Sequence, residues 1–201
     1  MRWLSLIVSG LATLLISGTH VCATPVQWSG NNHWYEPVLE EPGVRIGWQA
    51  AQADAISRRG YLATVTSAEE NQFVFALLGA EFWEPADVPG NPNYRVYGPW
   101  LGATDALQEG NWQWVTGEPW NYIDWARGEP NNLNGDEHYL QYLYKPDPAP
   151  TWNDAHNFSA RSYVVEYNSI PEPSALALLV SATIGLMAYV WRRRMGKGVG
   201  P

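Results

Sequence analysis

The 201-residue sequence contains one cysteine, Cys22, and is poor in basic residues. A single cysteine excludes an intramolecular disulfide, although small exported domains often depend on such cross-links. Residues 24–170 contain 7 Lys and Arg against 19 Asp and Glu, so this segment has a net charge of −12. A chain this acidic repels nucleic acid and anionic membranes and attracts cations. We therefore expect no nucleic-acid partner and no disulfide-stapled scaffold.

The sequence also lacks the patterns of common catalytic sites. No Ser-His-Asp arrangement or isolated carboxylate pair is evident, and the protein is predicted not to be an enzyme. His33, His138 and His156 do not have the spacing of zinc ligands. We interpret each of them as a surface or partly packed histidine.

The first 23 residues have the layout of a secretory signal peptide. Arg2 precedes an apolar run over residues 3–16, and small residues at 21 and 23 suit cleavage after Ala23. Residues 24–168 are then predicted to form one domain, since a chain of that length is sufficient to bury a single core.

The last part of the chain, residues 169–201, is predicted to be a sorting signal. Pro171-Glu172-Pro173 precedes the uncharged stretch 174–191, which has the length of a minimal transmembrane helix, and three arginines follow it. This order resembles the PEP-CTERM signal of exported bacterial proteins. The resemblance implies processing by an exosortase-type enzyme, with membrane anchoring through the C-terminal helix before processing. It also implies final delivery to the cell surface or the extracellular matrix.

The region between these signals is predicted to be α+β. Residues 47–59 form a first helix, with one face made by Trp48, Ala51, Ala55 and Ile56. A capping box at Ser67 and Glu70 begins a second helix that extends to Leu78. Its inward face is predicted to comprise Phe73, Val74, Leu77 and Leu78.

Strands are predicted after and around these helices, because several segments are rich in aromatic and β-branched residues. The predicted strands are 33–39, 100–103, 111–115, 138–144 and 161–167. Long stretches rich in Pro, Gly, Asn and Trp connect them, and loops of this length in a compact domain are usually functional or disordered. Their tryptophans favour order.

A series of short motifs resembles the C-type lectin-like domain over roughly residues 31–168. In chain order the motifs are GYLATV (60–65), SAEEN (67–71), WLG (100–102), EGNW (109–112), Trp125, GEPNN (128–132) and WND (152–154). The resemblance implies two helices, small antiparallel sheets and a long calcium-binding loop. The two disulfides of the family are missing. The places where its cysteines usually sit correspond by spacing to Tyr139, Asn157, Val165 and a helix residue near Ala55.

The long loop is rich in hard oxygen donors, which are the ligands that Ca²⁺ prefers. The resemblance implies a calcium site formed by Glu129, Asn131, Glu137, Asn153 and Asp154. The same comparison assigns carbohydrate contacts to Glu129, Asn131, Glu137 and Asn153. Only X-Pro bonds adopt the cis form at modest cost, and we predict a cis Glu129–Pro130 bond when calcium is bound. The alternative for this loop is a set of ordinary Asx turns.

The order Glu-Pro-Asn resembles that of lectins for equatorial hydroxyl pairs, as in mannose, N-acetylglucosamine or glucose. Galactose-preferring members carry Gln-Pro-Asp instead. Trp120, Trp125 and Trp152 lie near this loop in sequence and are candidates for packing against a sugar. For Trp125 and Trp152, a position in the core is the preferred interpretation.

A second metal site is also predicted from the resemblance. Asp105 and Glu109 match auxiliary calcium ligands, and Asn132 and Glu137 are candidates to complete them. Asn132 and His138 stand where family members often have aspartates, which favours weak calcium binding.

The leading hypothesis is a Ca²⁺-dependent carbohydrate-binding module on a bacterial surface or in an exopolysaccharide. The alternative is a protein- or surface-binding adhesion module in which calcium is only structural.

Overall fold

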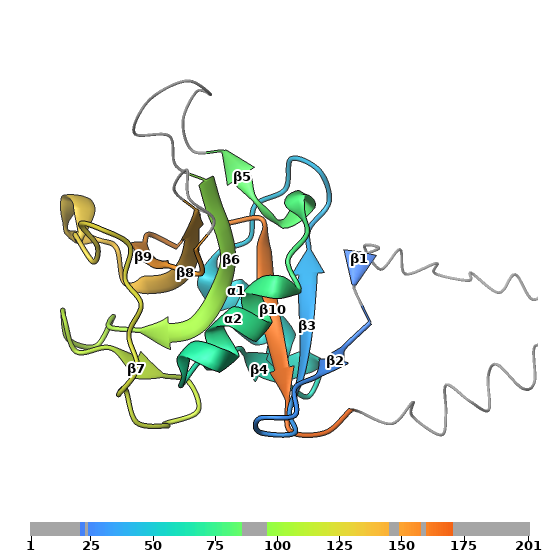
Figure 1. Cartoon of the computed structure of the whole chain (residues 1–201). Helices are drawn as coiled ribbons and strands as arrows, with labels where there is room; N and C mark the ends of the chain where they lie inside the picture. Colours follow the sequence, from blue (N-terminus) through green and yellow to red (C-terminus); the bar gives the residue numbers. More distant parts are fainter. Residues whose placement is uncertain (1–20, 23, 86–95, 145–148, 158–159, 171–201) are drawn as a thin grey trace, which may run out of the picture.

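A computed structural model describes residues 21–22, 24–85, 96–144, 149–157 and 160–170. Its strands and helices follow one another along the chain as shown in Figure 1. The elements are β1 (Val21–Cys22), β2 (Val26–Gln27), β3 (Trp34–Leu39), α1 (Trp48–Ser57), β4 (Tyr61–Leu62), α2 (Ala68–Ala76), η1 (Ala80–Phe82), β5 (Glu84–Pro85), β6 (Val96–Thr104), β7 (Gln113–Trp114), η2 (Leu133–Gly135), β8 (Tyr139–Tyr144), β9 (Trp152–Ala155) and β10 (Ser162–Tyr167).

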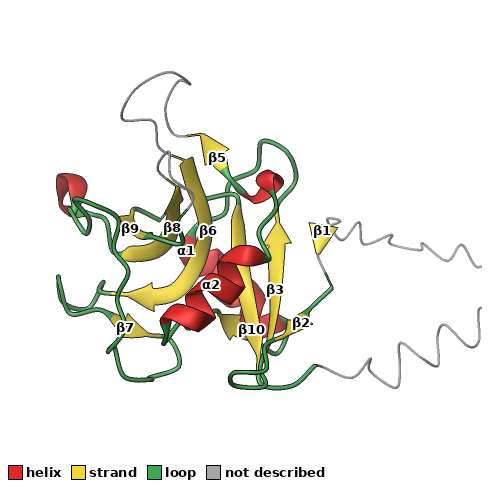
Figure 2. Cartoon of the chain, in the orientation of Figure 1, coloured by secondary structure: helices red, strands yellow, loops and turns green. Residues whose placement is uncertain are grey.

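The strands of the described residues form a mixed sheet with the order β1-β3-β10-β6-β8-β9. β10 is parallel to β6, with Tyr163 opposite Trp100, whereas the other strand pairs are antiparallel. The two helices lie beside the sheet (Figure 2). The predicted α+β class with a C-type lectin-like arrangement is confirmed.

Both predicted helices are present, with shorter boundaries and a corrected buried face. In α1, Trp48, Ala51 and Ala55 are buried as predicted, but Ile56 is 59% exposed and does not belong to that face. Ser67 caps α2 by accepting a hydrogen bond from the Glu70 amide at 3.1 Å, so the predicted cap is confirmed.

The predicted inward residues of α2 do face the core: Val74 is fully buried, and Phe73, Leu77 and Leu78 are partly buried against the same cluster. The helix boundary and the polar part of the buried face differ from the prediction. α2 ends at Ala76, which leaves Leu77 and Leu78 beyond the helix. Its fully buried residues are Glu70, Asn71 and Val74, so two of the three are polar. Periodicity of apolar residues did not predict this, because the partners of the polar side chains come from distant segments.

The five predicted strands correspond to β3, β6, β7, β8 and β10. β9 was not predicted, because Asn153 and Asp154 have low strand propensity. Its neighbours determine its structure: Leu140 of β8 pairs with Asp154, and Gln141 pairs with Asn153. All four residues of β9 are buried.

Packing and hydrogen bonds replace the missing disulfides. Ala55 and Val165 are both fully buried in one hydrophobic cluster. Near the two other places, the Gln49 side chain donates to the Tyr139 hydroxyl at 3.0 Å and accepts from the Asn157 amide at 3.2 Å. The described domain is therefore cross-linked without covalent bonds at these places.

Most of the predicted C-terminal signal, residues 171–201, and most of the predicted signal peptide lie outside the described residues. Of the leader, only Val21 and Cys22 are described, and they pair with Leu39 and Val38 of β3. Among the described helices, none combines the length and the apolar character needed to cross a membrane. β1 and the described residues after β10 lie on the side of the domain away from η2 (Figure 1).

Candidate functional site

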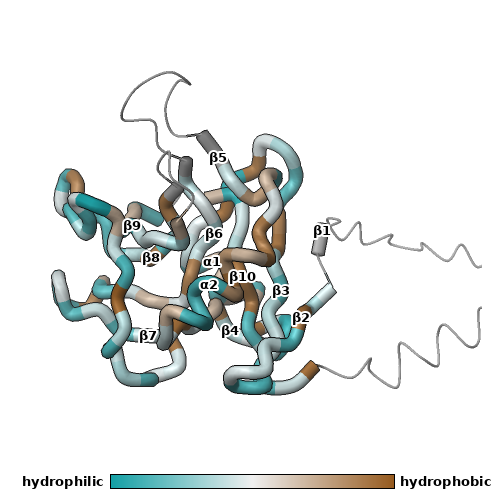
Figure 3. Tube along the Cα trace, in the orientation of Figure 1, coloured by the Kyte–Doolittle hydropathy of each residue, from teal (hydrophilic) through white to brown (hydrophobic). Residues whose placement is uncertain are grey.

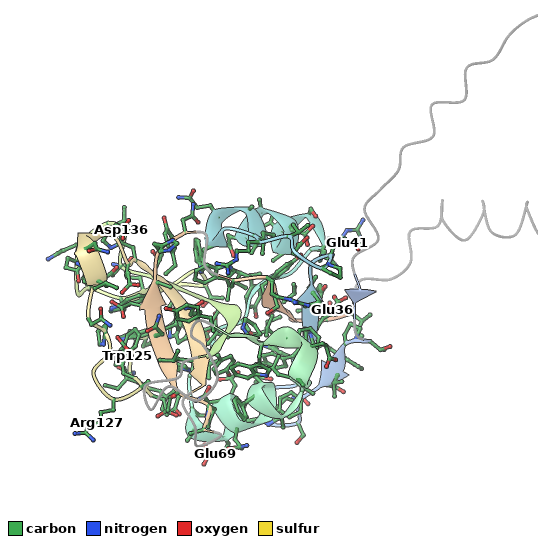
Figure 4. The ribbon with its side chains drawn as sticks, turned by 90° about the horizontal axis from the view of Figure 1, so that it is seen from above. Glu36, Glu41, Glu69, Trp125, Arg127 and Asp136 are labelled. Atoms are coloured by element: carbon green, nitrogen blue, oxygen red, sulfur yellow. The ribbon has the colours of Figure 1, made fainter. Side chains whose placement is uncertain are left out.

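The long connection between β7 and β8 forms one end of the domain. Much of this connection is hydrophilic (Figure 3), in contrast to the apolar residues at the domain centre. Asp136, Trp125 and Arg127 project on this side, and Glu36 and Glu41 lie on the opposite side (Figure 4). The connection contains the GEPNN motif and η2, so the predicted ligands gather at this end.

A cluster of tryptophans fixes the base of the connection. Trp152 is fully buried, and its ring lies 6.0 Å from Trp125 and 5.7 Å from Trp120. Trp125 also packs edge-to-face against Trp112, with 4.9 Å between ring centroids. A backbone bridge joins Trp125 to Trp152. Trp125 and Trp152 therefore pack with the core, as the sequence analysis favoured, and they hold the GEPNN segment beside β9.

Asp154 joins the GEPNN segment to β9. Its side chain is 1% exposed, and its two carboxylate oxygens accept hydrogen bonds from successive amides of the loop. The Asn131 N–H donates to Oδ1 at 3.1 Å, and the Asn132 N–H donates to Oδ2 at 2.6 Å. A residue of the sheet thereby orients the loop residues that carry the other candidate ligands.

Glu129 and Asn131 lie side by side at the surface of the loop. The Glu129–Pro130 peptide bond is cis, as predicted for the calcium-bound loop. The Asn131 side-chain amide donates a hydrogen bond to Oε2 of Glu129. Asn153, at 3% exposed, donates from its side-chain amide to the Asp154 carbonyl oxygen.

Glu137 closes the same loop from its C-terminal end. Its carboxylate accepts a hydrogen bond from the Leu133 N–H at 2.9 Å. Burial is the main cause that raises the pKa of Glu137 to about 7, and repulsion from Asp154, Glu129 and Asp136 acts in the same direction. The Leu133 hydrogen bond lowers that pKa but does not offset these effects. The loop thus collects more negative charge than its own donors neutralise.

Three of the five predicted calcium ligands are linked directly: Asn131 bonds to both Glu129 and Asp154, although Asp154 lies 23 residues further along the chain. Glu137 lies near enough to Asp154 and Glu129 for their charges to raise its pKa, and Asn153 precedes Asp154 in β9. These five residues lie on neighbouring segments of the fold. Their side chains provide three carboxylates and two amide oxygens, a donor set that fits a hard dication with flexible coordination. Chemically, this arrangement suits oxygen-coordinated Ca²⁺.

The residues of the predicted second site are divided between two places. Asp105 and Glu109 lie with His138, whose Nδ1 is 3.1 Å from Oδ1 of Asp105 and 3.5 Å from Oε2 of Glu109. Asn132 instead accepts a hydrogen bond from the Glu137 N–H at 3.2 Å through its side-chain oxygen. Sequence reasoning treated His138 as a surface or partly packed residue. The sequence signal for its place beside Asp105 and Glu109 was that it stands where family members often have an aspartate.

Residues 44–167 match the model of the lectin C-type domain, so the chain belongs to the C-type lectin domain family. Halomucin of Haloquadratum walsbyi is 30% identical over 172 aligned residues, which cover 77% of this chain and 2% of halomucin. Human C-type lectin domain family 4 member K is 32% identical over 112 aligned residues, which cover 54% of this chain and 29% of that protein. The chain thus spans only a small part of these two relatives.

A solved structure shows the same fold. The carbohydrate-recognition domain of the mouse scavenger receptor C-type lectin superposes with a TM-score of 0.57 at 22% identity, covering 74% of this chain and 97% of that domain. The fold and the family together define a lectin-like domain of a carbohydrate-binding family whose members are generally not enzymes.

Proposed function

We propose that this domain binds carbohydrate through a calcium ion held by Glu129, Asn131, Glu137, Asn153 and Asp154. The observation that carries the proposal is the placement of Glu129 and Asn131 as a hydrogen-bonded pair above Asp154, whose carboxylate holds the backbone of the same segment. A loop of plain Asx turns does not require three carboxylates on neighbouring segments, close enough for Asp154 and Glu129 to raise the pKa of Glu137. The raised pKa of Glu137 is consistent with a site that a cation would complete.

The side-chain chemistry indicates which part of a sugar the site recognises. A carboxylate only accepts hydrogen bonds, whereas the NH₂ of an amide donates them. The pairs Glu129 with Asn131 and Glu137 with Asn153 each offer one acceptor and one donor to a neighbouring hydroxyl. When bound, calcium would supply direct coordination of two such hydroxyls. The order Glu-Pro-Asn favours equatorial pairs of the mannose, N-acetylglucosamine or glucose type.

A glycan array probed with the purified protein, with and without a chelator, tests the proposal. We expect binding to mannose- or glucose-type glycans in calcium and loss of that binding after chelation. Glu69→Gln, which removes an exposed carboxylate of α2, is the matched control and is expected to bind normally. Absence of any glycan signal, or a signal that persists in chelator, would contradict the proposal. A calcium-induced rise in the melting temperature without glycan binding would instead support an adhesion module with structural calcium.

The double substitution Glu129→Gln with Asn131→Asp tests the hydroxyl network itself. It reverses which side chain donates and which accepts, and we expect preference to move from mannose-type to galactose-type sugars. Competition by free mannose and free galactose measures the change. Unaltered mannose preference in this variant would show that the network is wrong.

We also propose that the protein is exported and processed at its C-terminus. The signal-peptide layout and the PEP, apolar and arginine order support this, and the candidate site faces away from both described ends of the chain (Figure 1). Because one such site binds sugar weakly, display of many copies on a surface or polymer would raise avidity. Cell fractionation with terminal sequencing of the mature protein tests it, and an intact cytoplasmic chain would contradict it.

A further inference from the structure

Three potential metal ligands meet beside residues 128–137, which we call the sugar-site loop. Asp105 follows β6, Glu109 lies in the turn that leads to β7, and His138 immediately precedes β8. Their ligand atoms lie within 4.8 Å of one another. Nδ1 of His138 is 3.1 Å from an oxygen of Asp105 and 3.5 Å from an oxygen of Glu109.

The donor chemistry of this cluster does not fit calcium. Ca²⁺ takes six to eight oxygen ligands, whereas the central donor here is an imidazole nitrogen. Imidazole with carboxylates is a set that zinc and related transition metals accept, and zinc bonds to these donors have lengths of about 2.0–2.2 Å. In a tetrahedral site with such bonds, neighbouring donors are about 3.3 Å apart. The two measured separations from His138 lie on either side of that value.

The surrounding hydrogen bonds position two of the three donors before any ion arrives. The Gly110 N–H donates to Oδ2 of Asp105 at 2.8 Å, which leaves Oδ1 directed toward His138. The His138 carbonyl accepts from the Thr104 hydroxyl at 2.7 Å and from the Asp105 N–H at 3.2 Å. Such outer contacts orient metal ligands and strengthen their binding.

The third donor, the carboxylate of Glu109, is the most exposed of the three and can change its rotamer. The Asp105 side chain is 1% exposed, whereas the side chain of Glu109 is 54% exposed and that of His138 is 29% exposed. The exposed Glu109 carboxylate can rotate to complete the site, and the open side gives an ion and a water molecule access. Two carboxylates and a neutral imidazole balance the charge of a divalent cation.

We propose that Asp105, Glu109 and His138 bind a zinc-class transition-metal ion, with water in the fourth position. This site differs from the proposed calcium site in its ion and its residues, and it does not depend on sugar binding. The two are adjacent: His138 follows Glu137, and the Glu137 N–H donates to Asn132 of the GEPNN motif. An ion on His138 would therefore hold the C-terminal end of the sugar-site loop.

Isothermal titration of the chelator-treated protein with ZnCl₂, in saturating CaCl₂, tests the proposal. The calcium keeps zinc away from the oxygen-donor site. We expect one equivalent of zinc, and at least about a tenfold loss of affinity in His138→Gln. His156→Gln is the matched control, since it removes another exposed histidine, and it should bind like the wild type. Titration with Co²⁺ gives a second readout, because a tetrahedral site produces strong visible absorption that His138→Gln should abolish.

Two further variants distinguish an error in the zinc proposal from an error in the proposed calcium-dependent sugar binding. Glu129→Gln with Asn131→Asp should leave zinc affinity unchanged, whatever its effect on sugar binding. His138→Asp should lose zinc affinity and gain a calcium equivalent, because it restores an all-oxygen donor set. No zinc binding by the wild type, or unchanged binding by a folded His138→Gln variant, would overturn the assignment. A hydrogen-bonded histidine without a metal would then be the correct description.

Discussion

Two groups of buried carboxylates in this domain are stabilised in different ways. One group, Glu70 and Glu166, lies where α2 meets β10, and the other, Glu137 and Asp154, lies under the GEPNN loop. All four residues are less than 10% exposed. Burial of a carboxylate is costly unless hydrogen bonds or opposite charge compensate it. The two groups differ in where that compensation comes from.

At the first group, side chains from several elements supply donors in addition to the backbone amides of Thr64 and Thr66. Glu70 accepts from the Tyr35 hydroxyl at 2.5 Å and from the Asn31 amide at 2.9 Å. Glu166 accepts from the Tyr61 hydroxyl at 3.1 Å and lies 2.6 Å from Nδ1 of His33. This network links the N-terminal strand region, α2 and β10.

At the second group, backbone amides of one loop donate to the carboxylates. Asp154 accepts from Asn131 and Asn132, and Glu137 accepts from Leu133. These amides fix the loop, but they leave the carboxylates of Glu137, Asp154 and Glu129 close enough for their charges to repel one another. The comparison teaches that the first group joins distant segments of the fold, whereas the second fixes one loop, the loop that we propose to hold a cation. Each prediction below changes a residue that belongs to or contacts one of the two groups. The measurements show whether the change affects stability, binding or both.

The largest expected effect is that of Asp154→Ala on binding. This change removes a proposed calcium ligand and the acceptor of two loop amides. We therefore expect sugar affinity to fall by at least about 100-fold, or about 2.7 kcal/mol. The calcium-induced rise in the melting temperature should disappear as well. Titration calorimetry and thermal unfolding measure these effects. An unchanged calcium response would mean that Asp154 serves only the fold.

The second effect is a pH dependence of stability that comes from Glu166. Burial is the main cause that raises its pKa to about 7, and the nearby Glu70 adds to it, although the Thr64 N–H and His33 oppose the shift. Because the folded-state pKa is raised, the stabilising contribution is complete below the unfolded value of about 4.3 and is lost as pH rises through about 7. The loss amounts to at most about 4 kcal/mol.

Glu166→Gln should remove that pH dependence. The variant is expected to lose less stability than the wild type between pH 5 and pH 8, because its amide carries no charge at either pH. Urea unfolding at both pH values in the presence of a chelator measures the difference. Parallel pH profiles for the two proteins would show that Glu166 does not titrate in this range.

The smallest effect is that of Tyr35→Phe. Its hydroxyl is fully buried and donates to Glu70, so removal should cost about 1–2 kcal/mol of unfolding free energy. Tyr61→Phe is the graded comparison, and its half-buried hydroxyl should cost less. Both variants should keep wild-type calcium and sugar affinity. A loss of sugar binding in folded Tyr35→Phe would show that the two groups are coupled.

Several parts of the fold were predictable because their signals are local. The cap at Ser67 and the strands around Trp34–Leu39 and Ser162–Tyr167 follow from short patterns. The polar face of α2 was not predictable in this way. Glu70 and Asn71 look like surface residues in sequence, yet Asn71 bonds to Asp124 and Glu70 to Tyr35 across the fold.

The sequence by itself determined the acidic charge, the absence of disulfides and the kinds of donor available near Glu129 and Asn153. Tertiary structure decided which of these donors meet. β9 pairs with β8 and carries Asp154 under Asn131, and the same strand order brings His138 to Asp105. Such contacts join residues 23 and 33 positions apart, and only packing of the whole sheet fixes them. For that reason the sequence predicts a cation-binding loop and an auxiliary pair, Asp105 and Glu109, whereas the contact of His138 with that pair follows from the fold.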